Sequence, residues 1–215
     1  MKRILCYGDS NTWGFNSAPI LDGRLPERFD ENTRWTSLLQ KKLGSDYRVF
    51  EGGYNGRTTV FTDPTLDCCN GFEYLPVVFG TCDPLDLVII MLGTNDSRDQ
   101  FVHGSDLIVR GMERLLVLQK ELIAKSFNPG CKILVLAPPK ADPTVIAPLA
   151  YKKEWADIIS ELPPKYEALC ERMGVFFASA YDWAEVSPAD GLHFSAKGHA
   201  AFAENLEGVV RSILE

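Results

Sequence analysis

Apolar residues gather in five short runs along the chain, separated by stretches with helical or polar patterns. In the third run, every residue from Leu87 to Leu92 is apolar, with no alternation between apolar and polar side chains. A strand that is apolar on both faces is typical of a parallel sheet covered by helices on both sides. The five predicted strands are 3–8, 47–53, 85–93, 132–139 and 174–180.

Helical spacing of apolar residues predicts helices between these strands. The clearest helix is 106–125, because its apolar residues fall on a single stripe. That stripe contains Leu107, Ile108, Met112, Leu115, Leu116, Leu122 and Ile123. A helix over 33–43 is expected to end at Gly44 in a left-handed cap, and the last helix is expected to begin at the capping residue Ser195.

Alternating strands and helices predict an α/β fold. We expect one domain, residues 1–215, built as a three-layer α/β/α sandwich around a five-stranded parallel sheet. The stretches 15–32 and 138–148 are rich in proline or mixed charge and are expected to be long loops, which often carry function in compact domains.

Composition restricts the partners and the compartment that we expect. The formal net charge of −7 disfavours a nucleic-acid backbone or an anionic membrane as partner, since either would be repelled. The first residues carry an apolar run of about four, too short for a signal peptide, and no segment approaches the roughly 18 apolar residues of a membrane span. Six irregularly spaced cysteines indicate reduced thiols. The sequence therefore predicts a cytoplasmic protein.

Polar residues and glycines follow four of the predicted strands. Ligands of open α/β sheets bind outside the carboxyl ends of the strands, so these residues are the first candidates for a site. The four blocks are Gly8-Asp9-Ser10-Asn11, Gly52 to Thr59, Gly93-Thr94-Asn95-Asp96, and Asp190 to Phe194. We expect them to meet at one edge of the sheet.

Three of these residues fit the roles of a catalytic triad. A serine hydroxyl becomes a useful nucleophile when a neutral imidazole takes its proton, and a carboxylate fixes the tautomer of that imidazole. Ser10, His193 and Asp190 match the three roles, and the spacing of Asp190 and His193 lets both side chains face the same side of one turn. Acyl transfer also needs hydrogen-bond donors for the oxyanion. The backbone N–H groups of Ser10 and Gly56 and the side-chain amide of Asn95 would supply them.

The blocks "GDSNTWG", "GYNGRTT", "LGTND" and "DGLHF" resemble the SGNH-hydrolase (GDSL) esterase family over nearly the whole chain. Within that family, "RWTSLL", "GRTT" and "LDLVIIMLGTND" are similar to the arylesterase and acyltransferase branch. The resemblance implies a flavodoxin-like SGNH-hydrolase fold and hydrolysis of short-chain acyl and aryl esters, with acyl transfer to alcohols or peroxide. It also implies that the enzyme needs no metal or cofactor and forms a homo-oligomer. Asn11 stands where the family's usual name has leucine, a position without a chemical role in this scheme.

Other residues near these blocks are expected to support the site. Asp9 is expected to hold the turn at Ser10, and Trp13 is a candidate for lining a pocket. Phe15 and Trp35 are further candidates for the pocket or the core, while Arg34 and Arg57 are candidates for ion-paired supports. Asp96, His103 and His199 are expected to be structural.

Two other interpretations remain open from the sequence. A metal site would use Asp9, Asp190 and His193, but it lacks the third nitrogen or sulfur ligand usual for zinc. A flavodoxin-like module that binds a small molecule without turning it over is the second interpretation. It requires that the apparent triad be broken in three dimensions. The favoured hypothesis is a serine esterase that acts on small, neutral esters.

Overall fold

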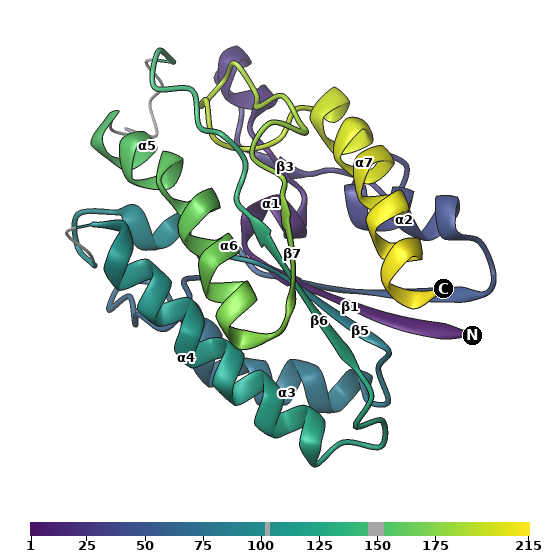
Figure 1. The fold of residues 1–215 in the computed structure, drawn as a ribbon. Coiled ribbons are helices and arrows are strands. Elements are labelled where there is room, and N and C mark those ends of the chain that lie inside the picture. The colour runs from purple at the N-terminus through teal and green to yellow at the C-terminus, as the bar shows by residue number, and fades with distance from the viewer. Residues whose placement is uncertain (102–103, 146–152) are drawn as a thin grey trace.

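The computed structural model describes residues 1–101, 104–145 and 153–215. At its centre lies a five-stranded parallel sheet in the order β4-β1-β5-β6-β7 (Figure 1). The strands are β1 (Lys2–Gly8), β4 (Tyr47–Gly53), β5 (Leu87–Met91), β6 (Lys132–Ala137) and β7 (Phe176–Ser179). The predicted parallel sheet and its five strands are confirmed. The third strand is shorter than expected, because the chain leaves the sheet after Met91.

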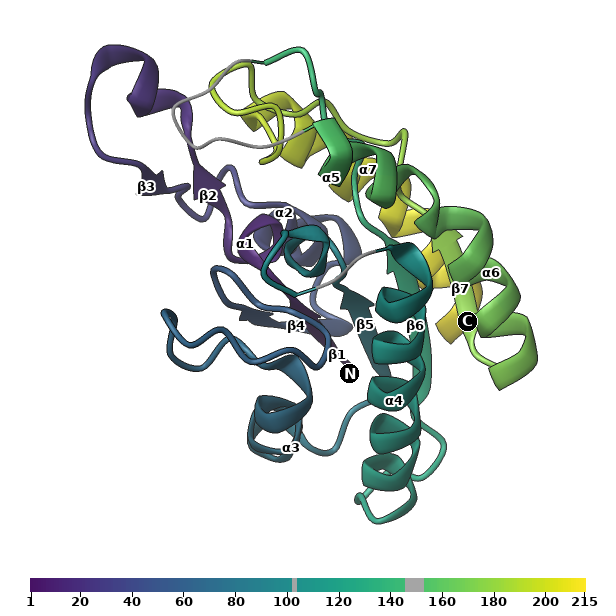
Figure 2. The ribbon, with the colours of Figure 1, turned by 90° about the vertical axis from the view of Figure 1, so that its left-hand side faces the viewer.

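Helices cover both faces of this sheet. One face carries α3 (Gly71–Cys82), α4 (Ser105–Ala124) and α6 (Leu162–Met173), and the other carries α2 (Trp35–Leu43) and α7 (Ala196–Leu214), as Figures 1 and 2 show. The remaining elements are α1 (Ser10–Trp13), α5 (Lys153–Ser160), the 3₁₀ turns η1 (Ala18–Asp22) and η2 (Asn95–Ser97), and the short antiparallel pair β2 (Phe15–Asn16) and β3 (Glu27–Arg28).

The alternation of side chains along each strand divides the core into two clusters. On β1, Leu5 and Tyr7 face α3, α4 and α6, whereas Ile4 and Cys6 face α2 and α7. All four side chains are buried, which explains why the sequence of the strand shows no polar alternation. The apolar run that predicted a covered sheet is therefore a direct consequence of the two helical layers.

The predicted helices form with small shifts. The stripe on α4 is buried against the sheet except at Leu107, which is 44% exposed, and at Leu122, which is partly buried. Ser195 caps α7, with its hydroxyl accepting a hydrogen bond from the N–H of Gly198. Gly44 does end α2 with a positive φ of 79°, but its ψ of −165° lies outside the left-handed helical region, so the expected left-handed cap is wrong.

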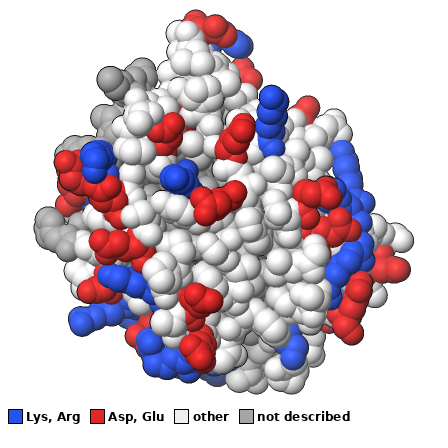
Figure 3. Space-filling view, turned by 45° about the horizontal axis from the view of Figure 1, so that its top comes forward, with Lys and Arg blue, Asp and Glu red and all other residues white. Residues whose placement is uncertain are grey.

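The two stretches expected to be long loops differ from one another. Residues 15–32 contain β2, η1 and β3, which form an arm at the edge of the molecule (Figure 2). Of 138–148, the described part up to 145 forms no helix or strand, and the rest lies outside the described residues, as does His103. Within the described ranges, no helix is long and apolar enough to cross a membrane. On the face in Figure 3, basic and acidic side chains are interspersed.

Candidate active site

Ser10 is the first residue of the one-turn helix α1, which begins where β1 ends. The Asp9 carboxylate caps this helix by accepting a hydrogen bond from the N–H of Asn11 at 2.9 Å. The side chain of Thr12 packs so close to position 8 that only glycine fits there, because a Cβ would collide with Thr12. Asp9 therefore has the supporting position that the sequence predicted, and the hydroxyl of Ser10 is presented at the carboxyl edge of the sheet.

His193 lies beside Ser10, although the two residues stand almost at opposite ends of the sequence. Its Nε2 is 2.8 Å from the Ser10 Oγ, and its Nδ1 is 2.6 Å from the Asp190 Oδ2. This arrangement favours the tautomer in which Nδ1 donates to the carboxylate and Nε2 accepts from the hydroxyl. The structure thus brings Ser10, His193 and Asp190 into a continuous hydrogen-bonded chain.

Asp190 is held in its ionised form by its neighbours. Burial would raise the pKa of the Asp190 carboxyl, but hydrogen bonds and charge from His193 outweigh burial and hold this pKa below its ordinary value. Its Oδ1 also accepts hydrogen bonds from the backbone N–H groups of Leu192 and His193. A carboxylate fixed at three points can orient the imidazole and stabilise its positive charge.

The predicted oxyanion donors lie around the same cavity. Gly56 has a φ of 76°, which glycine adopts without strain, in the turn that follows β4. Asn95 lies in η2 after β5, and one N–H of its side-chain amide donates to the carbonyl of Arg57 at 3.0 Å. The second N–H of that amide donates to none of the described residues, so it remains for a ligand. Ser10, Gly56 and Asn95 all line the cavity that contains His193.

Asp96 joins the loop that carries Asn95 to the loop that carries Gly56. Its carboxylate is fully buried and accepts hydrogen bonds from the N–H and the hydroxyl of Thr59. Burial raises the pKa of the Asp96 carboxyl to about 6, although the hydrogen bonds from Thr59 act in the opposite direction. Since Thr59 follows the turn at Gly56, Asp96 ties the loop of Asn95 to the loop of Gly56.

The cavity has a volume of about 450 Å³ and is mostly apolar away from the triad. The ring of Phe15 lies 4.2 Å from the ring of His193, centroid to centroid. The lining residues are Ser10, Phe15, Asn55, Gly56, Leu66, Thr94, Asn95, Arg98, Trp155, Asp190, Leu192 and His193. This volume suits a small ester.

The outcome for the other candidate residues is mixed. Trp13 does not line this cavity, because it turns away on α1 and its ring packs under the guanidinium of Arg28 at 5.0 Å. Trp35 is buried in the core against Phe202. Arg34 does pair with Glu51, with Nη2 and Oε2 3.0 Å apart.

Arg57 supports the site by a different interaction from the predicted ion pair. Its Nη1 donates to the carbonyls of Gly8 and Gly52, and its guanidinium lies over the ring of Tyr7 at 4.2 Å. These contacts join the ends of β1 and β4. Arg57 therefore fixes the two strands that carry Ser10 and the turn at Gly56.

Asn11 has a positioning role that sequence reasoning missed. Its Oδ1 accepts from the N–H of Phe194 at 2.8 Å, and its Nδ2 donates to the carbonyl of Leu192 at 3.4 Å. These two residues flank His193, so Asn11 joins the helix of the nucleophile to the loop of the base. Only the departure from the family's usual leucine marked this position in the sequence.

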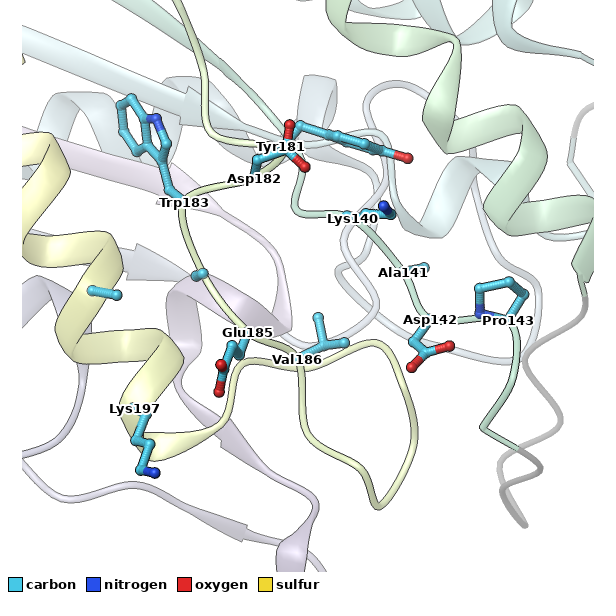
Figure 4. A pocket seen from close by; sticks show the side chains of 12 residues that line it. Lys140, Ala141, Asp142, Pro143, Tyr181, Asp182, Trp183, Glu185, Val186 and Lys197 are labelled. Atoms are coloured by element: carbon cyan, nitrogen blue, oxygen red, sulfur yellow. The ribbon is translucent and has the colours of Figure 1, made fainter.

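A larger groove of about 790 Å³ lies beyond β6 and β7, beside the start of α7 (Figure 4). It is lined by charged and aromatic side chains, among them Lys140, Asp182, Trp183, Glu185 and Lys197. None of the predicted site residues lines it. The smaller cavity is therefore the candidate active site, because it alone of these two holds a hydroxyl next to a base.

Comparison with known proteins agrees with this geometry. A sequence model of the GDSL-like lipase/acylhydrolase family matches residues 6–201. The chain belongs to the GDSL-like lipase/acylhydrolase family. A search of curated protein sequences finds no significant match.

Solved structures similar to this GDSL hydrolase extend over its full length. The native aryl esterase of M. smegmatis has a TM-score of 0.92 and 38% identity, with 100% of both chains covered. Est24, a carbohydrate acetylesterase from Sinorhizobium meliloti, has a TM-score of 0.91 and 33% identity, covering 99% of this chain and 100% of that one. A carbohydrate acetylesterase family member from the same organism has a TM-score of 0.87 and 36% identity, covering 100% and 99%.

The GDSL hydrolase is thus a carboxylic ester hydrolase with the predicted SGNH fold. A binding module without catalysis would have required a broken triad, whereas the three side chains lie within hydrogen-bonding distance. In the described part of the chain, no three His, Cys, Asp or Glu side chains form a group that could hold a metal ion.

Proposed function

We propose that this GDSL hydrolase cleaves small, neutral acyl and aryl esters through an acyl-enzyme formed on Ser10. The observation that carries the proposal is the chain from Asp190 through His193 to the Ser10 hydroxyl, with distances of 2.6 and 2.8 Å. A neutral imidazole within 3 Å of a hydroxyl is the arrangement that general-base activation requires. The cavity around Ser10 is large enough for one small substrate.

In the proposed first step, the Ser10 Oγ attacks the ester carbonyl while His193 Nε2 takes the hydroxyl proton. The carbonyl oxygen becomes an oxyanion, which the N–H groups of Ser10 and Gly56 and the amide of Asn95 would stabilise. Asp190 stabilises the imidazolium. His193 then gives the proton to the departing alcohol, whose C–O bond breaks, and the acyl group remains on Ser10.

In the proposed second step, His193 activates water, which attacks the acyl-enzyme and releases the acid. An alcohol or peroxide can take the place of water and yield a new ester or a peracid. The apolar side chains of Phe15, Leu66 and Leu192 around the cavity support transfer to an alcohol, because they favour an organic acceptor over bulk water. The aryl and acetyl esters that name the similar structures support the choice of small substrates.

Labelling with a fluorophosphonate probe tests the nucleophile. The wild-type protein should gain the mass of one phosphonyl group at Ser10, and Ser10→Ala should gain none. Ser17→Ala is the matched control, since Ser17 is also buried and close in sequence but does not line the cavity. Absence of labelling in the wild type, or labelling that survives in Ser10→Ala, would remove Ser10 from the mechanism.

We also propose a homo-oligomer and a cytoplasmic location, as the sequence and the resemblance predict. Support for the oligomer comes from the arm around η1, where Leu21 and Leu25 are 65% and 84% exposed. Light scattering on the wild type and on Leu25→Ser would test it, with a smaller assembly expected for the variant. A wild type that remains a monomer at high concentration would contradict the proposal.

A further inference from the structure

The catalytic cavity has two sides with different chemistry. His193 must protonate the leaving oxygen, so the alcohol part of a substrate lies beside His193, against Phe15 and Leu192. The acyl part is therefore left to the rest of the lining, which includes Leu66 and Arg98 beside Gly56. A Cβ built on Gly56 would lie 3.0 Å from Leu66 Cδ1 and 3.9 Å from Arg98 Nη2, so these two side chains border the acyl side.

Arg98 lines this side with most of its hydrogen-bonding capacity unused. A guanidinium has five N–H donors, and one of them, on Nε, donates to the Asn95 carbonyl at 3.2 Å. Nη2 is buried and has no hydrogen-bond partner within the described residues. Nη1 also makes no hydrogen bond to a described residue and, unlike Nη2, is not buried, so a ligand oxygen can reach it and gain affinity from a charged donor.

The carboxylate of Asp63 lies close to Arg98 but does not satisfy its donors. The Nη1 of Arg98 is 3.8 Å from the Oδ2 of Asp63, which is beyond hydrogen-bonding distance. Asp63 instead accepts three hydrogen bonds from other donors. Its Oδ1 accepts from the N–H and the hydroxyl of Thr65, and its Oδ2 accepts from the amide of Gln100 at 2.9 Å. Asp63 thus holds the guanidinium in place through charge while the N–H groups of Nη1 stay available.

We propose that Arg98 selects substrates whose acyl group carries a second hydrogen-bond-accepting oxygen, either a keto oxygen or a carboxylate. This inference rests on the proposed function, because it assigns the acyl side of the same cavity. The charge of Arg98 and the planar fork of its N–H groups suit such an oxygen better than an aliphatic chain end. Such esters extend the proposed class beyond simple acetyl compounds and, where the acyl group ends in a carboxylate, beyond neutral esters.

Three methyl esters of nearly equal shape test the proposal. Methyl isocaproate ends its acyl group in a branched alkyl, methyl levulinate ends it in a methyl ketone, and monomethyl succinate ends it in a carboxylate. Release of methanol, measured by gas chromatography, gives kcat/KM for each ester. For the wild type we expect methyl levulinate and monomethyl succinate to exceed methyl isocaproate by about 10- to 100-fold, the range for hydrogen bonds to charged groups.

The ratio of kcat/KM values within each variant is the measured quantity, so that any general loss of activity cancels. Arg98→Met keeps much of the side-chain length but removes every donor, and its ratios should fall to about threefold or less. Arg98→Lys keeps the charge and loses the fork, so it should retain part of the preference for monomethyl succinate and lose more of that for methyl levulinate.

Two results would overturn the assignment of Arg98 while leaving the esterase intact. One is a wild type that hydrolyses methyl isocaproate at least as well as both other esters. The other is a preference for the oxygen-bearing esters that survives unchanged in Arg98→Met. Failure of the wild type to hydrolyse any of the three esters, together with no phosphonyl labelling of Ser10, would instead refute the proposed function.

Discussion

The surroundings of His193 and His199 differ, although both side chains are buried and only one helical turn and a loop separate them. His193 is 7% exposed and His199 is 0% exposed. His193 lies between Asp190 and Ser10. His199 uses Nδ1 to accept the N–H of Trp35 at 3.2 Å, and its Nε2 has no hydrogen-bond partner among the residues that the structure describes. Burial alone therefore does not turn a histidine into a general base. The hydrogen-bond partners of its two ring nitrogens decide whether it can act as one.

The electrostatic surroundings of the two imidazole rings also differ. Burial is the main cause that lowers the pKa of His199 to about 3, and the charges of His193 and Arg34 lower it further. His199 thus stays neutral and packs edge-on against Phe29 and Phe194. His193 faces a carboxylate that can stabilise its positive charge, so proton transfer is possible there and unfavourable at His199.

Replacement of Asp190 by asparagine should remove the ability of His193 to act as a base, the property that distinguishes it from His199. An amide N–H facing His193 Nδ1 would force the proton onto Nε2, and the ring could not accept the Ser10 proton. In a serine protease with the same triad this change lowers kcat about 10⁴-fold. For Asp190→Asn we expect a loss of about 10³- to 10⁴-fold in kcat with p-nitrophenyl acetate. A loss smaller than tenfold would show that Asp190 does not orient the base.

His199→Ala should show the opposite behaviour, with lower stability and nearly normal catalysis. The substitution leaves a cavity and removes the acceptor of a buried N–H, and together these changes cost about 3 kcal/mol. Urea unfolding measures the loss, and kcat of the folded enzyme should stay within about threefold of the wild type. His199→Asn is the matched variant, because its Oδ1 can replace the Nδ1 acceptor and should recover part of the stability. A large loss of kcat in the folded His199→Ala protein would contradict a structural role.

Asn11 is bonded to the surroundings of both His193 and His199. Its side chain binds the residues on either side of His193, and its carbonyl accepts the indole N–H of Trp35, whose backbone N–H binds His199. Asn11→Leu should therefore lower kcat by about 10- to 100-fold through misplacement of His193, with little change in KM. Thr12 lies on the same helix, and its buried hydroxyl has no hydrogen-bond partner in the described part of the chain, so Thr12→Val should leave kcat unchanged. An equal effect of both variants would reduce Asn11 to a general packing role.

The sequence predicts some of these features and not others for physical reasons. The runs of apolar residues define the five strands, and the strand ends define where Ser10, Gly56, Asn95 and His193 can meet, because parallel strands end at a common edge. Residue type alone does not separate His193 from His199. Asp190, three residues before His193, supplies that signal.

Other features depend on contacts between distant segments. The hydrogen bond of Asn11 to Phe194 and the unused donors of Arg98 exist only once the loops have packed. The helix α3 lacks a clear apolar stripe in the sequence, because it is apolar nearly throughout and contains Pro76. The structure shows that Asn70 caps it, accepting from the N–H groups of Phe72 and Glu73.

The pH dependence of stability offers the smallest and most specific test of the comparison. The unfolded chain protonates histidine near its ordinary pKa of about 6.5, whereas folded His199 stays neutral down to a pKa of about 3. Its contribution is therefore complete above about pH 6.5 and is lost as the pH falls toward 3. Between pH 7 and pH 5 this one group should lower the free energy of unfolding of the wild type by about 2 kcal/mol. His199→Asn lacks the titrating ring, so its stability relative to the wild type should improve by this amount over the same range. Parallel curves for the two proteins would show that His199 takes up its proton equally in the folded and unfolded states, and the contrast with His193 would then rest on geometry alone.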